Sequence, residues 1–216
     1  LALKDDQAAA RAAERALELD PELGAAYRLR GMARRRKSYQ PAALRDYERA
    51  LELDPRDWQA LRQRGVVWLN RERYESALAD FDASLAIRPS GAVASIRGYA
   101  LTMLRRLDEA ERAYERAREL DPQNEVVLEN LIKFALRAKD PERALAYHLE
   151  RVKLRPEDPQ LWVEELELLL RGKHYEAVLQ RFAQRPELAR DPLALTHACS
   201  ALVELGRLGE ALERVE

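Results

Sequence analysis

The sequence has little cysteine, no long apolar run and almost no net charge, and each absence narrows the possible functions. Cys199 is the only cysteine among 216 residues, which excludes an internal disulfide and a multi-cysteine metal site. No apolar run approaches the roughly 18–20 residues of a membrane-spanning helix, so we expect no membrane insertion of this segment. The 37 Lys and Arg residues balance 38 Asp and Glu residues, which leaves no basic field for nucleic acid.

Recognisable catalytic motifs are missing as well. The histidines are His148, His174 and His197, and none stands in a Ser, Cys or carboxylate pattern of a known catalytic kind. His197 and Cys199 are two residues apart on an expected helix and point in different directions, whereas ligands of one metal prefer a spacing of three or four. We therefore expect no enzymatic activity, no cofactor and no metal.

What the sequence does contain is an internal repeat. The segment ERALELDP occurs at 14–21 and again at 48–55, and the variant ERARELDP follows at 115–122. The prolines that close the periods are spaced by 34, 34, 33 and 34 residues and are Pro21, Pro55, Pro89, Pro122 and Pro156. Between successive prolines lie two apolar patterns at helical spacing. Because proline stops a helix, each period is predicted to be a helical hairpin.

Small residues recur in register within these hairpins. The first helices carry Gly31, Gly65 and Gly98, and the second helices carry Ala43, Ala77 and Ala110. A glycine inside a helix costs about 1 kcal/mol relative to alanine. Three glycines at matched positions therefore indicate that the two helices of a hairpin approach closely there.

The unit from 58 to 90 resembles the tetratricopeptide repeat family. The residues that carry the resemblance are Leu61, Gly65, Trp68, Tyr74, Ala77, Phe81, Ser84 and Pro89. The resemblance implies an all-α fold, a right-handed superhelical solenoid of antiparallel helix-turn-helix units. It divides the chain into the second half of a truncated repeat at 1–23, repeats at 24–57, 58–90, 91–124 and 125–158, a degenerate repeat at 159–191 and a partial repeat at 192–216. Neither end offers a polar capping repeat, so we expect a segment of a longer protein.

Some positions depart from the family pattern. Arg34 stands where a large apolar residue is expected, and it opens the basic run RRRK at 34–37, which is typical of a helix C-terminus favoured by the helix dipole. His148 replaces an aromatic residue of a second helix, and we expect it in the core or half-buried. Pro186 falls inside the expected second helix of the degenerate repeat and predicts a local change in superhelical curvature.

The resemblance also implies a binding surface, because the first helix of each unit lines the concave face in this family. The groove residues that this predicts are Arg28, Met32, Arg35, Arg62, Gln63, Val66, Leu69, Asn70, Ile96, Tyr99, Met103, Asn130, Lys133, Arg137, Glu164 and Glu167. The amino-terminal third of this groove is basic, the middle is apolar and aromatic, and the later part is mixed to acidic. The carboxylate clamp of chaperone-binding members is poorly matched, because Arg28, Met32 and Gln63 replace its Lys and Asn residues.

These observations favour a noncatalytic scaffold that binds a partner protein, either a peptide segment or a folded domain, through the concave groove. Two alternatives stay open. In the first, the repeats serve as a periplasmic spacer or assembly arm of a bacterial outer-membrane exopolysaccharide export machine. In the second, they are regulatory repeats of a fused enzyme. The Arg-rich, Lys-poor composition suggests a bacterial source, and the sequence does not decide between periplasm and cytoplasm or define an oligomeric state.

Overall fold

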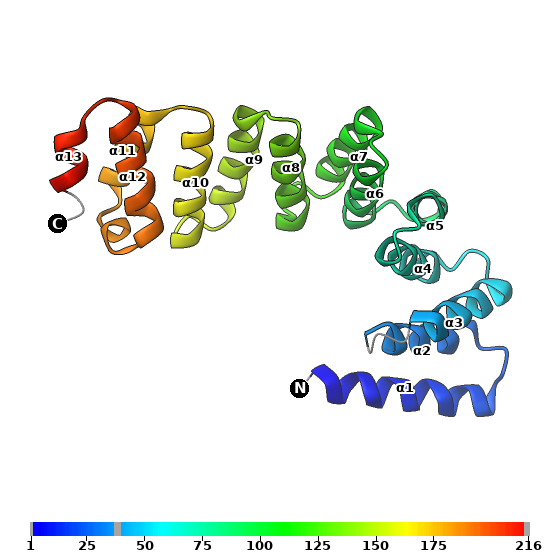
Figure 1. Cartoon of the computed structure of the whole chain (residues 1–216). Coiled ribbons are helices and arrows are strands. Elements are labelled where there is room, and N and C mark those ends of the chain that lie inside the picture. Colours follow the sequence, from blue (N-terminus) through cyan, green and yellow to red (C-terminus); the bar gives the residue numbers. More distant parts are fainter. Residues whose placement is uncertain (1, 37–39, 214–216) are drawn as a thin grey trace. The chain divides into compact units, whose positions relative to one another are not determined.

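The chain folds entirely into helices over the residues that the structure describes. The structure is a computed structural model, and it describes residues 2–36 and 40–213. The helices are α1 (Ala2–Leu19), α2 (Gly24–Arg36), α3 (Gln40–Leu53), α4 (Trp58–Asn70), α5 (Tyr74–Ile87), α6 (Gly91–Met103), α7 (Leu107–Leu120), α8 (Glu125–Arg137), α9 (Pro141–Leu154), α10 (Pro159–Arg171), α11 (Tyr175–Gln184), the 3₁₀-helix η1 (Pro186–Arg190), α12 (Pro192–Glu204) and α13 (Leu208–Glu213) (Figure 1). The all-α prediction is confirmed. Lys37, at the end of the basic run, lies outside the described residues.

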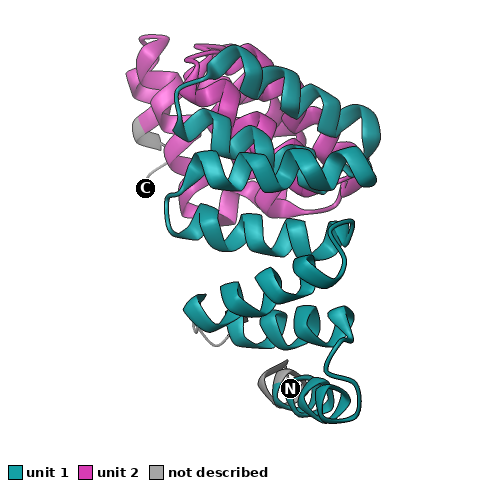
Figure 2. Ribbon diagram, turned by 90° about the vertical axis from the view of Figure 1, so that its right-hand side faces the viewer, with its two compact units in different colours: residues 1–122 teal, residues 123–216 magenta. Residues whose placement is uncertain are grey.

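The helices form two compact units, residues 1–122 and residues 123–216 (Figure 2). In the first unit, α2 packs against α3, α4 against α5 and α6 against α7, and α1–α2, α3–α4 and α5–α6 contacts join the successive pairs. In the second unit, α8 packs against α9, α9 against α10, and α10 against both α11 and α12. Helical hairpins stacked on their neighbours are the predicted solenoid architecture, which is thus confirmed.

The first helix of each hairpin in the first unit comes close to the second at a glycine. Cβ atoms added at Gly31, Gly65 and Gly98 would lie 2.7, 2.6 and 2.8 Å from the rings of Tyr47, Phe81 and Tyr114. Ala43, Ala77 and Ala110 are each 0% exposed. Small residues thus let an aromatic ring of the second helix lie against the backbone of the first.

In the first two of these hairpins, the residue before the glycine forms an ion pair with the second helix. Nη2 of Arg30 donates to Asp46 at 2.7 Å, and Nη2 of Arg64 donates to Asp80 at 2.7 Å. Both carboxylates are buried, and the hydrogen bond to Asp80 raises the pKa of Arg64. Arg34, the departure from the family pattern, joins the first pair by donating to Asp46 at 2.8 Å. Part of the basic run is therefore used to neutralise a buried carboxylate.

The same positions carry the opposite charges in the hairpin of α10 and α11. Counted from the start of each helix, Glu165 and Arg181 correspond to Arg64 and Asp80. Glu165 is 1% exposed, and its carboxylate lies 2.9 Å from Arg181 and 2.9 Å from Arg185. An interhelical ion pair is therefore retained, but here the first helix carries the acidic residue and the second helix the basic one.

Non-glycine residues occupy the left-handed region where a first helix turns into a second. Glu72, Arg105, Lys139 and Lys173 have φ values of 58°, 60°, 61° and 61°. The N–H of the next residue donates a hydrogen bond to a carbonyl in the last turns of the preceding helix. For example, the Asp140 N–H donates to the Ala135 carbonyl at 2.9 Å. Helices often end in this way with glycine, which avoids the steric cost of a side chain there.

Pro186 has a local effect on the second unit. Helix α11 ends at Gln184, and residues Pro186–Arg190 form η1 instead of a continuing helix. Leu188 of η1 is 1% exposed and packs in the hydrophobic core of this unit. Within the described residues, no helix has the length and apolar character to cross a membrane.

Candidate functional site

The basic residues of α2 that were predicted to line the groove are partly used to stabilise the fold. Nε of Arg28 donates to Asp57 at 2.8 Å, and the two side chains are only 17% and 13% exposed. Asp57 is also the N-cap of α4, where its carboxylate accepts the N–H groups of Gln59 and Ala60 at 3.0 Å each. Arg28 therefore fixes the start of the next hairpin, and its guanidinium is not an unoccupied anchor.

Arg35 of α2 lies close to Tyr47 of α3. The Tyr47 side chain is 0% exposed, and burial raises the pKa of its hydroxyl to about 12, although the neighbouring Arg35 charge acts in the opposite direction. The Tyr47 hydroxyl and Nε of Arg35 are buried without hydrogen-bond partners among the described residues. Arg62, the next predicted basic residue, is half-buried on α4.

The apolar middle of the predicted groove is largely part of the core. Met32 packs on a cluster that includes Tyr47 and Val67, and Val66, Leu69 and Ile96 pack on the cluster around Phe81. Gln63 is only 4% exposed. Tyr99 and Met103 are 37% and 38% exposed, and Asn70 is exposed. These last three side chains are the predicted residues of the first unit that are most open to a partner.

The second unit contains a pocket of about 400 Å³ between α8, α9 and α10. Its lining consists of Glu129, Ile132, Lys133, Leu136, His148, Arg151, Gln160, Glu164, Glu167, Leu168 and Arg171. The structure thus brings the predicted residues Lys133, Glu164 and Glu167 into one pocket. Asn130 and Arg137 were predicted with them and do not line it.

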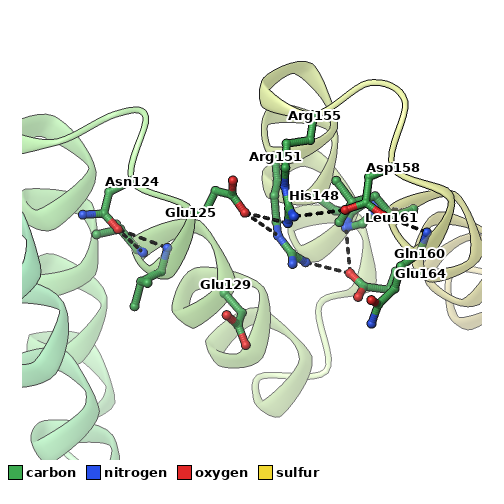
Figure 3. Close-up of polar contacts among 12 residues, drawn as sticks. Asn124, Glu125, Glu129, His148, Arg151, Arg155, Asp158, Gln160, Leu161 and Glu164 are labelled. Atoms are coloured by element: carbon green, nitrogen blue, oxygen red, sulfur yellow. Dashed lines mark hydrogen bonds and ion pairs between the residues drawn. The ribbon is translucent and has the colours of Figure 1, made fainter. Parts of the chain in front are cut away.

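His148 forms the deepest polar part of this pocket. The side chain is 1% exposed, and its Nε2 lies 2.9 Å from the backbone carbonyl of Leu161 (Figure 3). Because a carbonyl only accepts, Nε2 carries the hydrogen. Burial lowers the pKa of His148, although the bond to Leu161 and the charge of Glu164 act against this. The neutral ring therefore presents an unprotonated Nδ1, which lies 3.8 Å from the Glu164 carboxylate.

Arg151 links the floor of the pocket to its wall. Its Nη1 donates to Glu164 at 2.7 Å, and its side chain is 15% exposed (Figure 3). Its Nε is buried and has no hydrogen-bond partner among the residues that the structure describes, because Glu125 at 3.9 Å is too distant. Arg155 donates to the same Glu125 carboxylate at 2.7 Å. Arg151 is therefore held at one end and leaves one donor unused.

Two exposed ion pairs form the rim. Lys133 donates to Glu129 at 2.6 Å, and Arg171 donates to Glu167 at 2.7 Å. The Lys133 and Arg171 side chains are 63% and 54% exposed. Exposed pairs of this kind contribute little stability and rearrange easily. The pocket thus offers an apolar wall and a rim that can present either charge.

The pocket occurs where the fourth hairpin departs from the repeat pattern. Ile132 and His148 occupy the positions of the glycine and the aromatic ring of the earlier hairpins, and Arg151 occupies that of a small residue, Ser84 in the second hairpin. An imidazole fills less space than a phenol or phenyl ring. The His148 departure is visible in the sequence, whereas the role of Arg151 was missed, although its position 34 residues after Ala117 would have indicated it. The described residues hold no group of three or more His, Cys, Asp or Glu side chains that could bind a metal.

Comparisons with known proteins agree with this architecture. Family models described as tetratricopeptide repeat match residues 29–96 and 92–124. No curated protein sequence matches the chain. Among solved structures, YrrB, described as a TPR protein with an unusual peptide-binding site, has a TM-score of 0.65 at 21% identity over 87% of this chain and 98% of its own. PilF from Pseudomonas aeruginosa has a TM-score of 0.64 at 23% identity over 88% of each chain.

A third similar structure is MamA from Desulfovibrio magneticus RS-1, with a TM-score of 0.64 at 21% identity over 71% of this chain and 88% of its own. At these identities the likeness concerns the fold, and it agrees with the repeat signature in residues 29–124. The repeat matches show that residues 29–124 consist of tetratricopeptide repeats, and the stacked helical hairpins and the similar solved structures show that the chain has the fold of tetratricopeptide repeat proteins.

Proposed function

We propose that this chain is a noncatalytic scaffold that binds a segment of a partner protein along the inner faces of its first helices. The pocket between α8, α9 and α10 receives a side chain of that segment. The observation that carries the proposal is that three charged residues predicted from the repeat register, Lys133, Glu164 and Glu167, line this pocket together with apolar side chains.

The chemistry of the pocket suits a side chain with an apolar shaft and a polar end. Ile132 and Leu168 are 8% and 5% exposed and supply an apolar wall. Nδ1 of His148 is an acceptor, and the ion pair of Arg151 with Glu164 adds a fixed charged group. Ligand sites are commonly apolar with a few fixed polar groups of this kind. A protein partner also agrees with the interaction role that is typical of the repeat family.

The test begins with selection of peptides from a displayed random library on the purified chain. Their dissociation constants are then measured for the wild type and for a variant with Lys133→Glu and Glu167→Lys. Both side chains lie at the exposed rim, so the fold is retained while each rim charge is reversed. We expect binding about tenfold weaker or more, equivalent to the loss of one interaction of about 1.4 kcal/mol.

A matched control reverses two charges of the same unit outside the pocket, Lys153→Glu and Glu176→Lys. Both residues are exposed and neither lines the pocket. The control is expected to bind the selected peptides like the wild type. Equal affinities for the rim variant and the control, with both folded, would refute the proposed site.

A further inference from the structure

In two hairpins of the first unit, an arginine of the first helix binds a buried carboxylate of the second helix. Arg64 binds Asp80 through two parallel hydrogen bonds, Nε to Oδ2 at 2.9 Å and Nη2 to Oδ1 at 2.7 Å. Arg30 binds Asp46 at the corresponding positions, with Nη2 to Oδ1 at 2.7 Å. The carboxylates are 5% and 2% exposed. Paired hydrogen bonds from a planar guanidinium are the preferred way to bind a carboxylate.

The third hairpin keeps the arginine and lacks the carboxylate. Arg97 of α6 corresponds to Arg64, and Ala113 of α7 corresponds to Asp80. Nε of Arg97 instead donates to Asp82 of α5 at 2.5 Å, an acidic side chain that is 55% exposed. A pocket of about 310 Å³ lies between α5, α6 and α7, and both Arg97 and Ala113 line it. The pocket is located where the earlier hairpins hold their own carboxylate.

The charges around this pocket favour an anion. Arg112 and Arg116 of α7 line it together with Arg97. Arg112 forms no ion pair with a described residue, and the terminal nitrogens of Arg97 make no hydrogen bond within the described chain. The lining also contains two acidic residues, and both are paired: Asp82 accepts from Nε of Arg97, and Glu109 is held by two bonds of 2.6 Å from Arg106. Donors of Arg97 and Arg112 are thus available to a ligand.

We propose that the Arg97 pocket, lined by Arg97, Arg112, Ala113 and Arg116, is a binding site for a carboxylate supplied from outside the chain. The ligand group takes the place that Asp80 occupies against Arg64. It accepts hydrogen bonds from the terminal nitrogens of Arg97 and from Arg112. An acidic side chain of a partner and a free small carboxylate share this chemistry. The site contains none of the residues of the predicted groove, so it stands independently of the function proposed above.

The experiment is a nuclear magnetic resonance titration of the whole chain with sodium acetate against sodium chloride at constant ionic strength. The signals to follow are the amides of Arg97 and Ala113 and the Nε–H groups of Arg97 and Arg112. Saturable shifts with acetate, absent with chloride, are expected for the wild type. Ala113→Asp supplies the missing carboxylate from within and should weaken acetate binding by about tenfold or more.

Ala113→Asn is the matched control, because it has the shape of the aspartate without its charge. The Asp variant is expected to melt about 2–4 °C above the Asn variant, since only the Asp variant offers the terminal nitrogens of Arg97 a carboxylate from within the hairpin. Two terminally blocked peptides, uncharged except for Glu or Gln at one position, distinguish an acidic side chain of a partner from a free small carboxylate. Preference for the Glu peptide over acetate identifies a partner side chain, and equal binding identifies a free carboxylate. No acetate-specific shift in the wild type, or undiminished shifts in the Asp variant, would overturn the proposal.

Discussion

The contact between Gly65 and Phe81 allows a quantitative test of how the hairpins pack. Gly65→Ala adds one methyl group to α4. Its Cβ would lie 2.6 Å from Cε1 and 2.9 Å from Cδ1 of Phe81, and 3.2 Å from Cβ of Asp80. Carbon atoms in favourable contact are about 3.5–4.0 Å apart, so the ring must move by nearly 1 Å. Phe81 is 0% exposed and has no open space on the solvent side.

The magnitude follows from two opposing effects. Overpacking of a filled core costs about 1–3 kcal/mol, whereas replacing glycine by alanine inside a helix returns about 1 kcal/mol. We therefore expect Gly65→Ala to lower the free energy of unfolding by about 0–2 kcal/mol. Phe81→Leu alone should cost about 1–2 kcal/mol by removing part of a buried ring. In the double variant the new methyl group enters the vacated space, so the two costs should not add.

The assay is a double-mutant cycle measured by urea denaturation, with hydrogen exchange of the α4 and α5 amides to localise the effect, because repeat arrays do not always unfold in one step. A favourable coupling of about 1–2 kcal/mol is expected between the two substitutions. Gly209→Ala is the control, because a Cβ there would have no neighbour within 4 Å. Additive costs, or a Gly65→Ala variant stabilised as much as the control, would show that the helices do not meet at Gly65.

Three further outcomes are expected. Asp80→Ala leaves the Arg64 guanidinium, whose side chain is 25% exposed, without its partner, and should lower the free energy of unfolding by about 2–4 kcal/mol in urea denaturation. Lys139→Gly removes the steric cost at a φ of 61° and should raise the free energy of unfolding by about 0.5–1 kcal/mol. A lower free energy of unfolding would mean that the turn is not strained. The lowered pKa of His148 means that the unfolded chain binds the proton more tightly, so stability is full above the unfolded pKa of about 6.5 and falls as the pH drops below it. His148→Phe should remove this part of the pH dependence in melts between about pH 7 and 5, and an unchanged slope would contradict a neutral buried ring.

The fold was predictable from the sequence because its signals are local and repeated. The proline spacing and the helical apolar patterns required no knowledge of distant contacts. The all-α hairpin solenoid followed from them, and the structure and the repeat matches confirm it. The departure at Pro186 was visible too, although η1 depends on how Leu188 packs in the core of the second unit.

The site was less predictable because it depends on side chains brought together by three helices. The periodicity placed Lys133, Glu164 and Glu167 on the inner faces, and they meet in one pocket. It could not show that Arg28 is held by Asp57, because that pair joins neighbouring hairpins. Nor could it show that Arg34 serves a buried carboxylate. Ion-pair partners depend on the rotation of each helix, which an apolar pattern determines only coarsely.

Backbone amide shifts measured during titration with a selected peptide test the central claim most directly, namely that the pocket between α8, α9 and α10 receives a partner side chain. The account predicts that the largest changes fall on Lys133, Leu136, Glu164 and Glu167 and that His148→Phe, which enlarges the ring at the pocket floor, reduces them. Changes confined to residues outside the pocket, with those of the pocket unaffected, would contradict it.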